Sequence, residues 1–288
     1  MTSNDRVNLI PEQLWLSFNN EKTVVTLNFH LEKTRNAISS GIAESLSEFG
    51  NAITGKSSHH PVLDCLDGKT PAVLALRSHC EGVFLSGGNL YELASMTPPE
   101  GERFTNQMRI FTEMLRTAPF VTVALLNGIA AGGGAEIALA TDLRFSLSDK
   151  VQIQFAQTHW GVPAGWGMMT DLSRKGIFTN ERRRGIAMAS QESLGLEDLI
   201  NRQLIDGRFE NASSPDDACN RWLESFVERL SRCPDPLKRA LIVDRPNLQA
   251  DKLEEFDKNL FGQYWLESVH KDRIQDYLQT RSEKKKDK

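Results

Sequence analysis

The sequence has 288 residues, of which 40% are hydrophobic and 25% charged, and its formal net charge is −4. A chain of this size and composition can bury the core of one large globular domain. The net negative charge argues against nucleic-acid binding, because proteins that bind a phosphate backbone usually carry a surplus of lysine and arginine.

The first part of the chain consists of short apolar runs around one amphipathic pattern. Alternating apolar residues over 14–18 and 24–29 predict two strands joined by a polar turn. Residues 39–53 predict a helix with one apolar face. The polar segment 55–70 is expected to be a loop, and the unbroken apolar run 72–76 a buried strand.

The middle of the chain continues this alternation. Apolar residues at helical spacing over 104–115 predict a helix that ends before Pro119. Residues 121–142 read as a buried strand, a tight turn and a helix, and 143–145 and 151–155 as two further short strands. Strands that alternate with helices in this way predict an α/β fold with parallel strands.

The stretch 121–142 also contains the first candidate site. A helix that starts within Gly132-Gly133-Gly134 leaves backbone N–H groups without intrahelical partners, and these groups favour negative charge. The polar residues and glycines interrupt the run too often for a membrane span. Neither phosphate-binding pattern, G-x-x-x-x-G-K-[ST] or G-x-G-x-x-G, fits, because the glycines are followed by Ala135-Glu136 and a glutamate would repel a bound phosphate. The remaining alternative is that the glycines only let the helix pack tightly on a sheet.

The last third of the chain is predominantly helical. Helices are expected over 216–232, 235–243 and 248–280, with the apolar stripes of a cap or an oligomer interface. The expected organisation is an N-terminal extension over 1–11, a core over 12–215, a C-terminal helical region over 216–280 and a disordered basic tail over 281–288.

Three motifs follow one another with specific separations: Arg35-Asn36-Ala37-Ile38, then Ser86-Gly87-Gly88-Asn89-Leu90, then Asn127-Gly128 followed by Gly132-Gly133-Gly134 and Glu136. In this order, within about residues 12 to 270, they resemble the crotonase (enoyl-CoA hydratase/isomerase) superfamily. The resemblance implies an α/β core built as a spiral of ββα units, with a C-terminal helical region that assembles homotrimers or dimers of trimers. It also implies that the substrate is an acyl-CoA thioester.

The resemblance assigns roles to individual residues. Two backbone N–H groups that bind the thioester oxygen map onto Gly88 and Gly133, where the absence of a side chain lets the backbone approach the substrate. Such donors stabilise the negative charge of an enolate. CoA recognition maps onto Lys33, Arg35, Asn36, Ala37, Ser86, Asn89, Leu90 and Tyr91.

The reaction that follows the enolate is less constrained. Hydratases of the superfamily use two glutamates, of which one maps onto Glu136 and the other onto His159. An imidazole titrates near neutral pH, so His159 can serve as acid or base; the alternative is that it only lines the pocket.

Within the superfamily, the chain resembles the animal ethylmalonyl-CoA and methylmalonyl-CoA decarboxylases, through the 132–136 glycine motif and the 161–167 loop with Trp166. Decarboxylation suits an apolar pocket that strips water from the substrate carboxylate, and Trp160 and Trp166 can form its wall; the alternative is that these tryptophans belong to the core. A carboxy-lyase acting on a short malonyl-CoA is therefore expected. The alternatives are hydration or isomerisation, and a CoA-binding paralogue with degenerate catalysis.

Neither a metal nor a cofactor apart from the CoA of the substrate is expected, because clustered ligands and a dinucleotide motif are absent from the sequence. The four cysteines are scattered and form no C-x-x-C pair, which suits a reducing compartment. The first residues show neither a secretory nor a mitochondrial leader pattern, so a cytoplasmic location is expected.

Overall fold

The computed structural model describes residues 6–174, 180–233 and 250–264, together with 237, 241, 268–269, 271–276 and 279. It divides into two compact units, Met1–Arg232 and Cys233–Lys288. The second unit contains helix α11 (Ala250–Tyr264), which lies within the helix predicted over 248–280. Most of the helix predicted over 235–243, and all of 281–288, lie outside the described residues.

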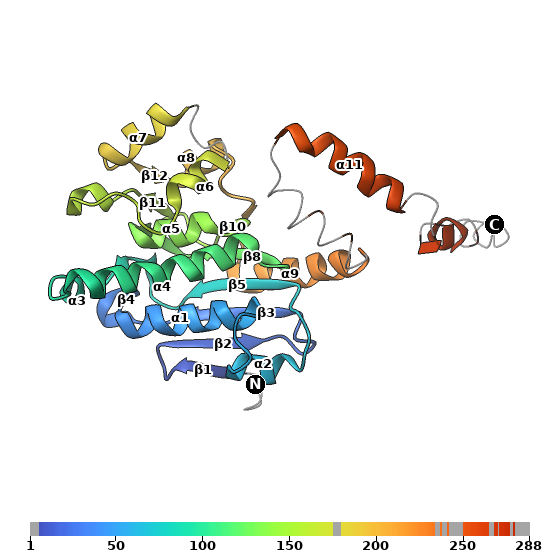
Figure 1. Cartoon of the computed structure of the whole chain (residues 1–288), viewed down its shortest axis with the longest axis horizontal. Helices are drawn as coiled ribbons and strands as arrows, with labels where there is room; N and C mark the ends of the chain where they lie inside the picture. Colours follow the sequence, from blue (N-terminus) through green and yellow to red (C-terminus); the bar gives the residue numbers. More distant parts are fainter. Residues whose placement is uncertain are drawn as a thin grey trace. The chain divides into compact units, whose positions relative to one another are not determined.

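The first unit is built on a seven-stranded sheet, of which β1, β2, β3, β5, β8 and β10 follow one another upwards in Figure 1. Strands β1, β2 and β3 are antiparallel neighbours, and β3, β5, β8, β10 and β13 run parallel to one another. The strands are β1 (Arg6–Ile10), β2 (Leu14–Phe18), β3 (Val24–Phe29), β5 (Val73–Ser78), β8 (Val121–Leu126), β10 (Leu143–Ser146) and β13 (Gly207–Arg208).

Two smaller sheets complete the strands. One has the order β12-β11-β9-β6, with β12 (Ser193–Gly195), β11 (Gln152–Gln154), β9 (Gly128–Ala131) and β6 (Gly82–Leu85). The other pairs β4 (Ala37–Ile38) with β7 (Gly87–Gly88) in parallel. This short pair places the two glycines of β7 beside the loop before α1.

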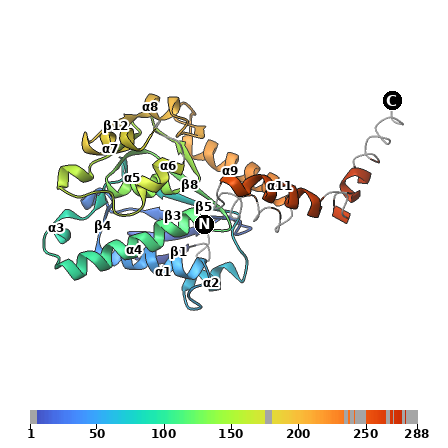
Figure 2. The ribbon, with the colours of Figure 1, turned by 45° about the horizontal axis from the view of Figure 1, so that its top comes forward.

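Helices pack on these sheets, and α1 and α4 lie side by side in both ribbon views (Figure 1 and Figure 2). Helix α5 is the most enclosed, since every residue from Gly134 to Ala140 is buried. The α-helices are α1 (Ser40–Ile53), α2 (Pro61–Leu66), α3 (Leu90–Leu93), α4 (Pro98–Thr117), α5 (Gly133–Ala140), α6 (Met168–Arg174), α7 (Glu181–Ala189), α8 (Leu196–Asn201) and α9 (Pro215–Ser231); η1 (Glu32–Thr34) and η2 (Gln157–Trp160) are 3₁₀ turns.

The chain repeatedly leaves the large sheet to add a strand to the smaller one. It passes from β5 to β6, from β8 to β9 and from β10 to β11, and helices follow the first two of these strand pairs. The predicted ββα core with parallel strands is confirmed. The reading of 121–142 as a single strand before the helix is wrong, because the strand breaks at Asn127. There the side-chain amide donates to the carbonyl of Cys80 at 2.8 Å and fixes the change of sheet.

The predicted loop 55–70 contains helix α2. Pro61 occupies its first turn, where a missing N–H costs nothing, and the His60 side chain accepts a hydrogen bond from the N–H of Val62. Val62 and Leu66, four residues apart, are both buried. A helix of six residues makes fewer than two turns, which is too short for a periodic signal, so the sequence did not reveal it.

The segment expected as an N-terminal extension also contributes to the sheet. Strand β1 pairs with β2 along its length, and Val7 is buried. The paired structure therefore includes Arg6 to Ile10. None of the helices in the described part of the chain combines the length and apolarity that crossing a membrane requires.

Candidate active site

The backbone of β7 and that of the β9–α5 turn approach each other closely at the N-terminal end of α5. Gly87, in β7, has a φ of +91°, and a Cβ there would stand 3.0 Å from the carbonyl oxygen of Ala131 and 3.1 Å from the backbone nitrogen of Gly133. Only glycine tolerates both this conformation and this approach. The packing brings the two predicted donors, Gly88 and Gly133, to the same place.

Both glycines line one cavity of about 550 Å³. Its walls come from β7, α3, α4, the β9–α5 turn, η2 and the loop before α6, and they are predominantly apolar. The residues that line it are Ser86, Gly87, Gly88, Leu90, Leu93, Gly101, Phe104, Thr105, Ala131, Gly132, Gly133, Glu136, Ala156, Gln157, Trp160, Val162, Pro163, Gly165 and Trp166. Gly133 is the first residue of α5, so its N–H belongs to the turn that has no intrahelical acceptor.

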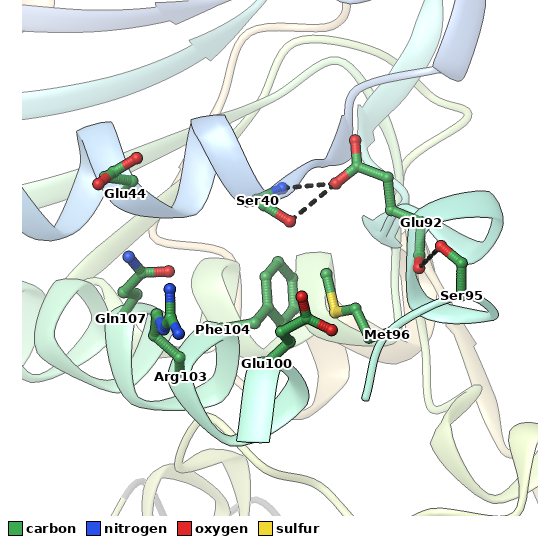
Figure 3. Close-up of a pocket in the computed structure, with 9 residues that line it drawn as sticks. All are labelled: Ser40, Glu44, Glu92, Ser95, Met96, Glu100, Arg103, Phe104 and Gln107. Carbon is green, nitrogen blue, oxygen red and sulfur yellow. Dashed lines mark hydrogen bonds between the residues drawn. The ribbon is translucent and has the colours of Figure 1, made fainter. Parts of the chain in front are cut away.

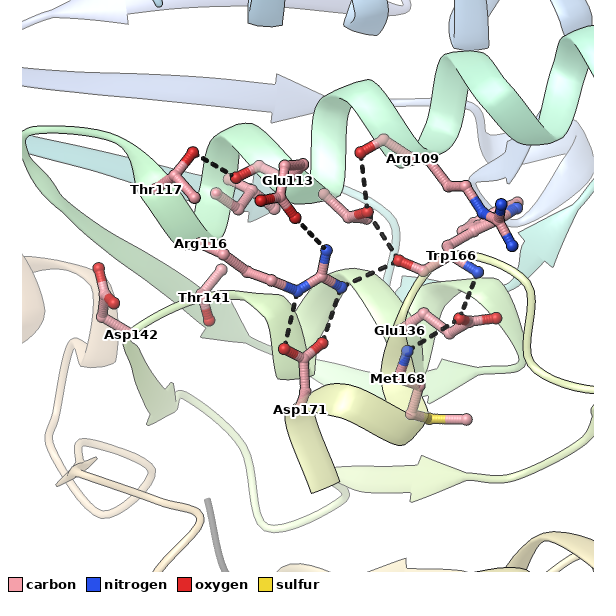
Figure 4. Close-up of polar contacts among 12 residues, drawn as sticks. Arg109, Glu113, Arg116, Thr117, Glu136, Thr141, Asp142, Trp166, Met168 and Asp171 are labelled. Carbon is pink, nitrogen blue, oxygen red and sulfur yellow. Dashed lines mark hydrogen bonds and ion pairs between the residues drawn. The ribbon is translucent and has the colours of Figure 1, made fainter. Parts of the chain in front are cut away.

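Glu136 lies at the inner wall of this cavity and is only 2% exposed. Its Oε2 accepts the N–H groups of Trp166 at 2.7 Å and Met168 at 3.2 Å (Figure 4). Its Oε1 accepts the N–H of Gly165 at 3.3 Å and Nε2 of Gln157 at 3.2 Å. Burial raises the pKa of Glu136, and these four donors offset part of that rise.

The indole of Trp166 lies directly against Gly133. A Cβ on Gly133 would overlap the six-membered ring of Trp166, so only glycine fits beneath it. Trp166 is 6% exposed, and its ring meets the ring of Phe104 in an edge contact, with centroids 5.8 Å apart. Trp166 therefore forms a wall of the cavity at the position of the second predicted donor.

His159, by contrast, is exposed and is not among the residues that line the cavity. Its ring meets that of Trp160 edge-on at 4.8 Å. Residues 157–160 form the 3₁₀ turn η2, in which positions three apart share a face. Gln157 and Trp160 therefore face the cavity, and His159 points elsewhere.

Gln157 is a polar cavity residue that the sequence analysis missed. It is 6% exposed, and its Oε1 has no hydrogen-bond partner among the described residues. Its nearness to Glu136 depends on η2 being a 3₁₀ turn. The one signal in the sequence was its place directly after the predicted strand over 151–155.

The residues predicted to recognise CoA separate into two groups. Ser86 and Leu90 line the cavity. The remaining six do not line it: Lys33, Arg35, Asn36, Ala37, Asn89 and Tyr91. Lys33 and Arg35 are exposed, Tyr91 is 91% exposed, and Asn89 caps α3 by accepting the N–H of Tyr91 at 3.1 Å. Ala37 is buried in β4.

Asn36 has a structural role in the fold. Its side chain is fully buried, its Oδ1 accepts the N–H of Leu31 at 2.7 Å, and its Nδ2 donates to Ser78 Oγ at 2.8 Å and to the Phe84 carbonyl at 3.0 Å. These bonds hold the loop that carries Lys33 and Arg35 onto the large sheet. Any contact between Asn36 and a ligand would have to come from its backbone.

A second, smaller cavity of about 320 Å³ lies between α1, α3 and α4 (Figure 3). It is lined by Ser40, Glu44, Glu92, Ser95, Met96, Glu100, Arg103, Phe104 and Gln107. Glu92 Oε2 accepts bonds from the backbone N–H and the hydroxyl of Ser40, at 2.8 and 2.9 Å. Phe104 lines both cavities. Among the described residues, no group of three or more His, Cys, Asp or Glu is arranged to hold a metal ion.

Comparison with known proteins places this site in a family. The family model for enoyl-CoA hydratase/isomerase matches residues 19–285. The chain therefore belongs to the enoyl-CoA hydratase/isomerase family.

Individual relatives carry several names. Ethylmalonyl-CoA decarboxylase of Danio rerio is 27% identical over 190 residues, which are 64% of this chain and 61% of that protein. Enoyl-CoA hydratase domain-containing protein 2, mitochondrial, of Mus musculus is 34% identical over 186 residues, 62% of this chain and 59% of that protein. The chain thus spans about three fifths of the length of these relatives.

Solved structures agree in fold. An enoyl-CoA hydratase from Bacillus anthracis superposes with a TM-score of 0.72 at 18% identity, covering 92% of this chain and 96% of that chain. An enoyl-CoA hydratase structure from Geobacillus kaustophilus HTA426 gives a TM-score of 0.75 at 18% identity, with 96% of each chain covered.

Proposed function

We propose that this protein is an enzyme that processes acyl-CoA thioesters through an enolate, and that its reaction is the decarboxylation of a short malonyl-CoA derivative such as ethylmalonyl-CoA or methylmalonyl-CoA. Family membership supports the thioester, and relatives named ethylmalonyl-CoA decarboxylase support the reaction. The cavity supports the enolate, because Gly88 and Gly133 both line it.

In this reaction the bond between the α-carbon and the carboxylate carbon breaks, and CO₂ leaves. The electron pair of that bond forms the enolate, whose negative charge moves to the thioester oxygen. Two N–H donors at Gly88 and Gly133 would stabilise that charge, and one such donor is typically worth about 3 kcal/mol. The α-carbon then takes up a proton to give the product acyl-CoA.

The observation that carries this proposal is the hydrogen bonding of Glu136. Among the described residues that line the cavity it is the one carboxylate, and both of its oxygens already accept hydrogen bonds. A carboxyl group engaged in this way is a poor base for activating water, whereas loss of CO₂ needs no base to begin.

Hydration is the second candidate, because the unpartnered Oε1 of Gln157 offers an acceptor to a water molecule beside Glu136. A relative named methylglutaconyl-CoA hydratase, from Homo sapiens, is 26% identical over 240 residues. A CoA-binding protein without turnover is the third candidate, and it is favoured by the position of His159 outside the cavity lining. The homotrimer and the cytoplasmic location stay predictions.

The test is to incubate the purified protein separately with ethylmalonyl-CoA, methylmalonyl-CoA and crotonyl-CoA and to follow the products by mass. Loss of CO₂ from the first two, with no water added to the third, is the expected result. Addition of water to crotonyl-CoA without any decarboxylation would contradict the proposal and favour the hydratase. Binding of all three without turnover would favour the third candidate.

A further inference from the structure

The cavity is closed at one point by two aromatic rings. An acyl group whose thioester oxygen lies at Gly88 and Gly133 begins directly beside the indole of Trp166, because that ring covers Gly133. The edge contact between Trp166 and Phe104 continues the wall. An acyl chain that grows in this direction meets a packed ring surface.

The backbone of Trp166 is held from both sides (Figure 4). Its N–H donates to Glu136 at 2.7 Å, and its carbonyl accepts the hydroxyl of Thr112 at 2.7 Å and Nη2 of Arg116 at 2.9 Å. The preceding carbonyl, of Gly165, accepts Nε of Arg109 at 2.7 Å. Hydrogen bonds to charged groups are among the stronger ones in proteins, so the backbone from which the indole projects has little freedom to move.

The space behind this wall does not suit an alkyl chain. Phe104 also lines the smaller cavity, whose other walls include the carboxylates of Glu44, Glu92 and Glu100 and the guanidinium of Arg103 (Figure 3). An alkyl tail that displaced Phe104 would enter a space lined by charged groups and would strip water from them at a cost. The aromatic wall and the polar cavity behind it therefore both limit the length of the acyl chain.

We propose that Trp166 sets the upper limit on acyl chain length, and that Glu136 is a positioning residue that fixes the backbone from which the indole covers Gly133. The inference rests on the proposed function only in that an acyl-CoA thioester occupies the larger cavity; it holds for decarboxylation and hydration alike. The substrate class is accordingly short acyl groups.

The test measures the dissociation constants of butyryl-CoA and octanoyl-CoA by calorimetry, in the wild type and in Trp166→Ala. The wild type is expected to bind butyryl-CoA more tightly. Trp166→Ala is expected to shift the ratio of the two constants by about tenfold or more in favour of octanoyl-CoA, since methylene groups are discriminated by pocket walls to this degree. Trp166→Phe, which keeps an aromatic ring in the core, is expected to shift the ratio less and in the same direction.

The control is the same truncation at a distant tryptophan. Trp15, on β2, stacks on His79 with centroids 5.0 Å apart and is not among the cavity residues. Trp15→Ala is expected to leave the ratio of dissociation constants unchanged. Thermal unfolding of each variant identifies any that is not folded.

The positioning role of Glu136 has its own readout. Glu136→Ala removes the acceptor for the Trp166 N–H and is expected to shift the chain-length ratio toward that of Trp166→Ala. Glu136→Gln keeps an oxygen acceptor for this N–H and is expected to keep a chain-length ratio close to that of the wild type. A purely structural contribution would lower the affinity for both thioesters equally and leave their ratio unchanged.

An unchanged ratio in folded Trp166→Ala and Trp166→Phe would overturn the proposal. A shifted ratio with no CO₂ loss from ethylmalonyl-CoA would support the chain-length proposal and contradict the decarboxylase function. Failure of the wild type to bind either thioester would remove the acyl-CoA function itself, and with it this inference.

Discussion

Arg116 and Asp171 form a bidentate ion pair beneath the loop that carries Trp166. Nε and Nη2 of Arg116 each lie 2.8 Å from a carboxylate oxygen of Asp171, and the two side chains are 8% and 3% exposed. Nη2 also donates to the carbonyl of Trp166. The pair therefore connects the end of α4 with both the cavity wall and the start of α6.

Removal of one partner of this pair should be costly. Asp171→Ala leaves the buried guanidinium with only the exposed carboxylate of Glu113, 3.6 Å away, as a counter-charge, and we expect the free energy of unfolding to fall by about 3 kcal/mol. The double variant Arg116→Met/Asp171→Leu buries no charge, and Thr112 still donates to the Trp166 carbonyl. It should therefore be clearly more stable than the single variant. Urea denaturation measures both, and a double variant no more stable than Asp171→Ala would contradict this account.

A side chain at the second donor should damage the site. The Cβ of Gly133→Ala overlaps the Trp166 ring, so either the indole or the N–H must move. We expect the rate of CO₂ release to fall about a hundredfold or more, the typical effect of losing one donor to the oxyanion. Gly133→Ala combined with Trp166→Leu should regain part of that loss, since it relieves the overlap.

Gly41→Ala is the matched control for the glycine substitution. Gly41 lies in α1, and a Cβ there meets no atom within 4 Å. Alanine is the better helix former, so this variant should keep full activity and gain some stability. Equal losses of activity in Gly41→Ala and Gly133→Ala would show that the effect is not specific to the donor.

The parts of the site that could be predicted from the sequence are those carried by contiguous motifs. Gly88, Gly133 and Glu136 all line the cavity, because they lie in β7 and in the first turn of α5, two short elements whose residues are close in sequence. Other positions depend on tertiary geometry. Asn36 lies within a motif, yet its amide is used entirely by the fold.

The same limit applies to the elements. Asn127 separates two apolar strands, β8 and β9. A single polar residue between them is too short an interval to predict that the chain passes from one sheet to another. Helix α2 has only two buried apolar residues. His159 was predicted to act in the cavity, whereas Gln157 lines it. The difference arises because η2 is a 3₁₀ turn with three residues per turn, which its sequence does not reveal.

The positions of Gln157 and His159 relative to the cavity give a direct prediction. His159 is exposed and outside the cavity lining, so we expect His159→Ala to change kcat/KM for CO₂ release by less than about twofold, as is usual for a surface substitution. Gln157→Leu removes a donor to Glu136 and places an apolar group in the cavity, and it should lower kcat/KM. Steady-state kinetics of the two variants measures kcat/KM for each. A lower kcat/KM in His159→Ala alone would support the acid or base role predicted for His159.

The raised pKa of Glu136 makes the stability of the protein depend on pH. Burial favours the protonated carboxyl in the folded state, whereas in the unfolded chain the group ionises near its ordinary value of 4.5. Between 4.5 and the folded-state pKa the native protein therefore binds more protons at this site than the unfolded chain. The stability from this group is fully present below 4.5 and is lost as the pH rises through the folded-state pKa. Glu136→Gln cannot ionise and should lack this loss.

The measurement is the free energy of unfolding by urea at a series of pH values from 4 upward, compared between the wild type and Glu136→Gln. The difference between the two curves should change in favour of the variant as the pH rises. Glu44→Gln is the matched control, because Glu44 is exposed on α1, and its curve should run parallel to that of the wild type. A Glu136→Gln curve parallel to that of the wild type would show that folding does not raise the pKa of Glu136.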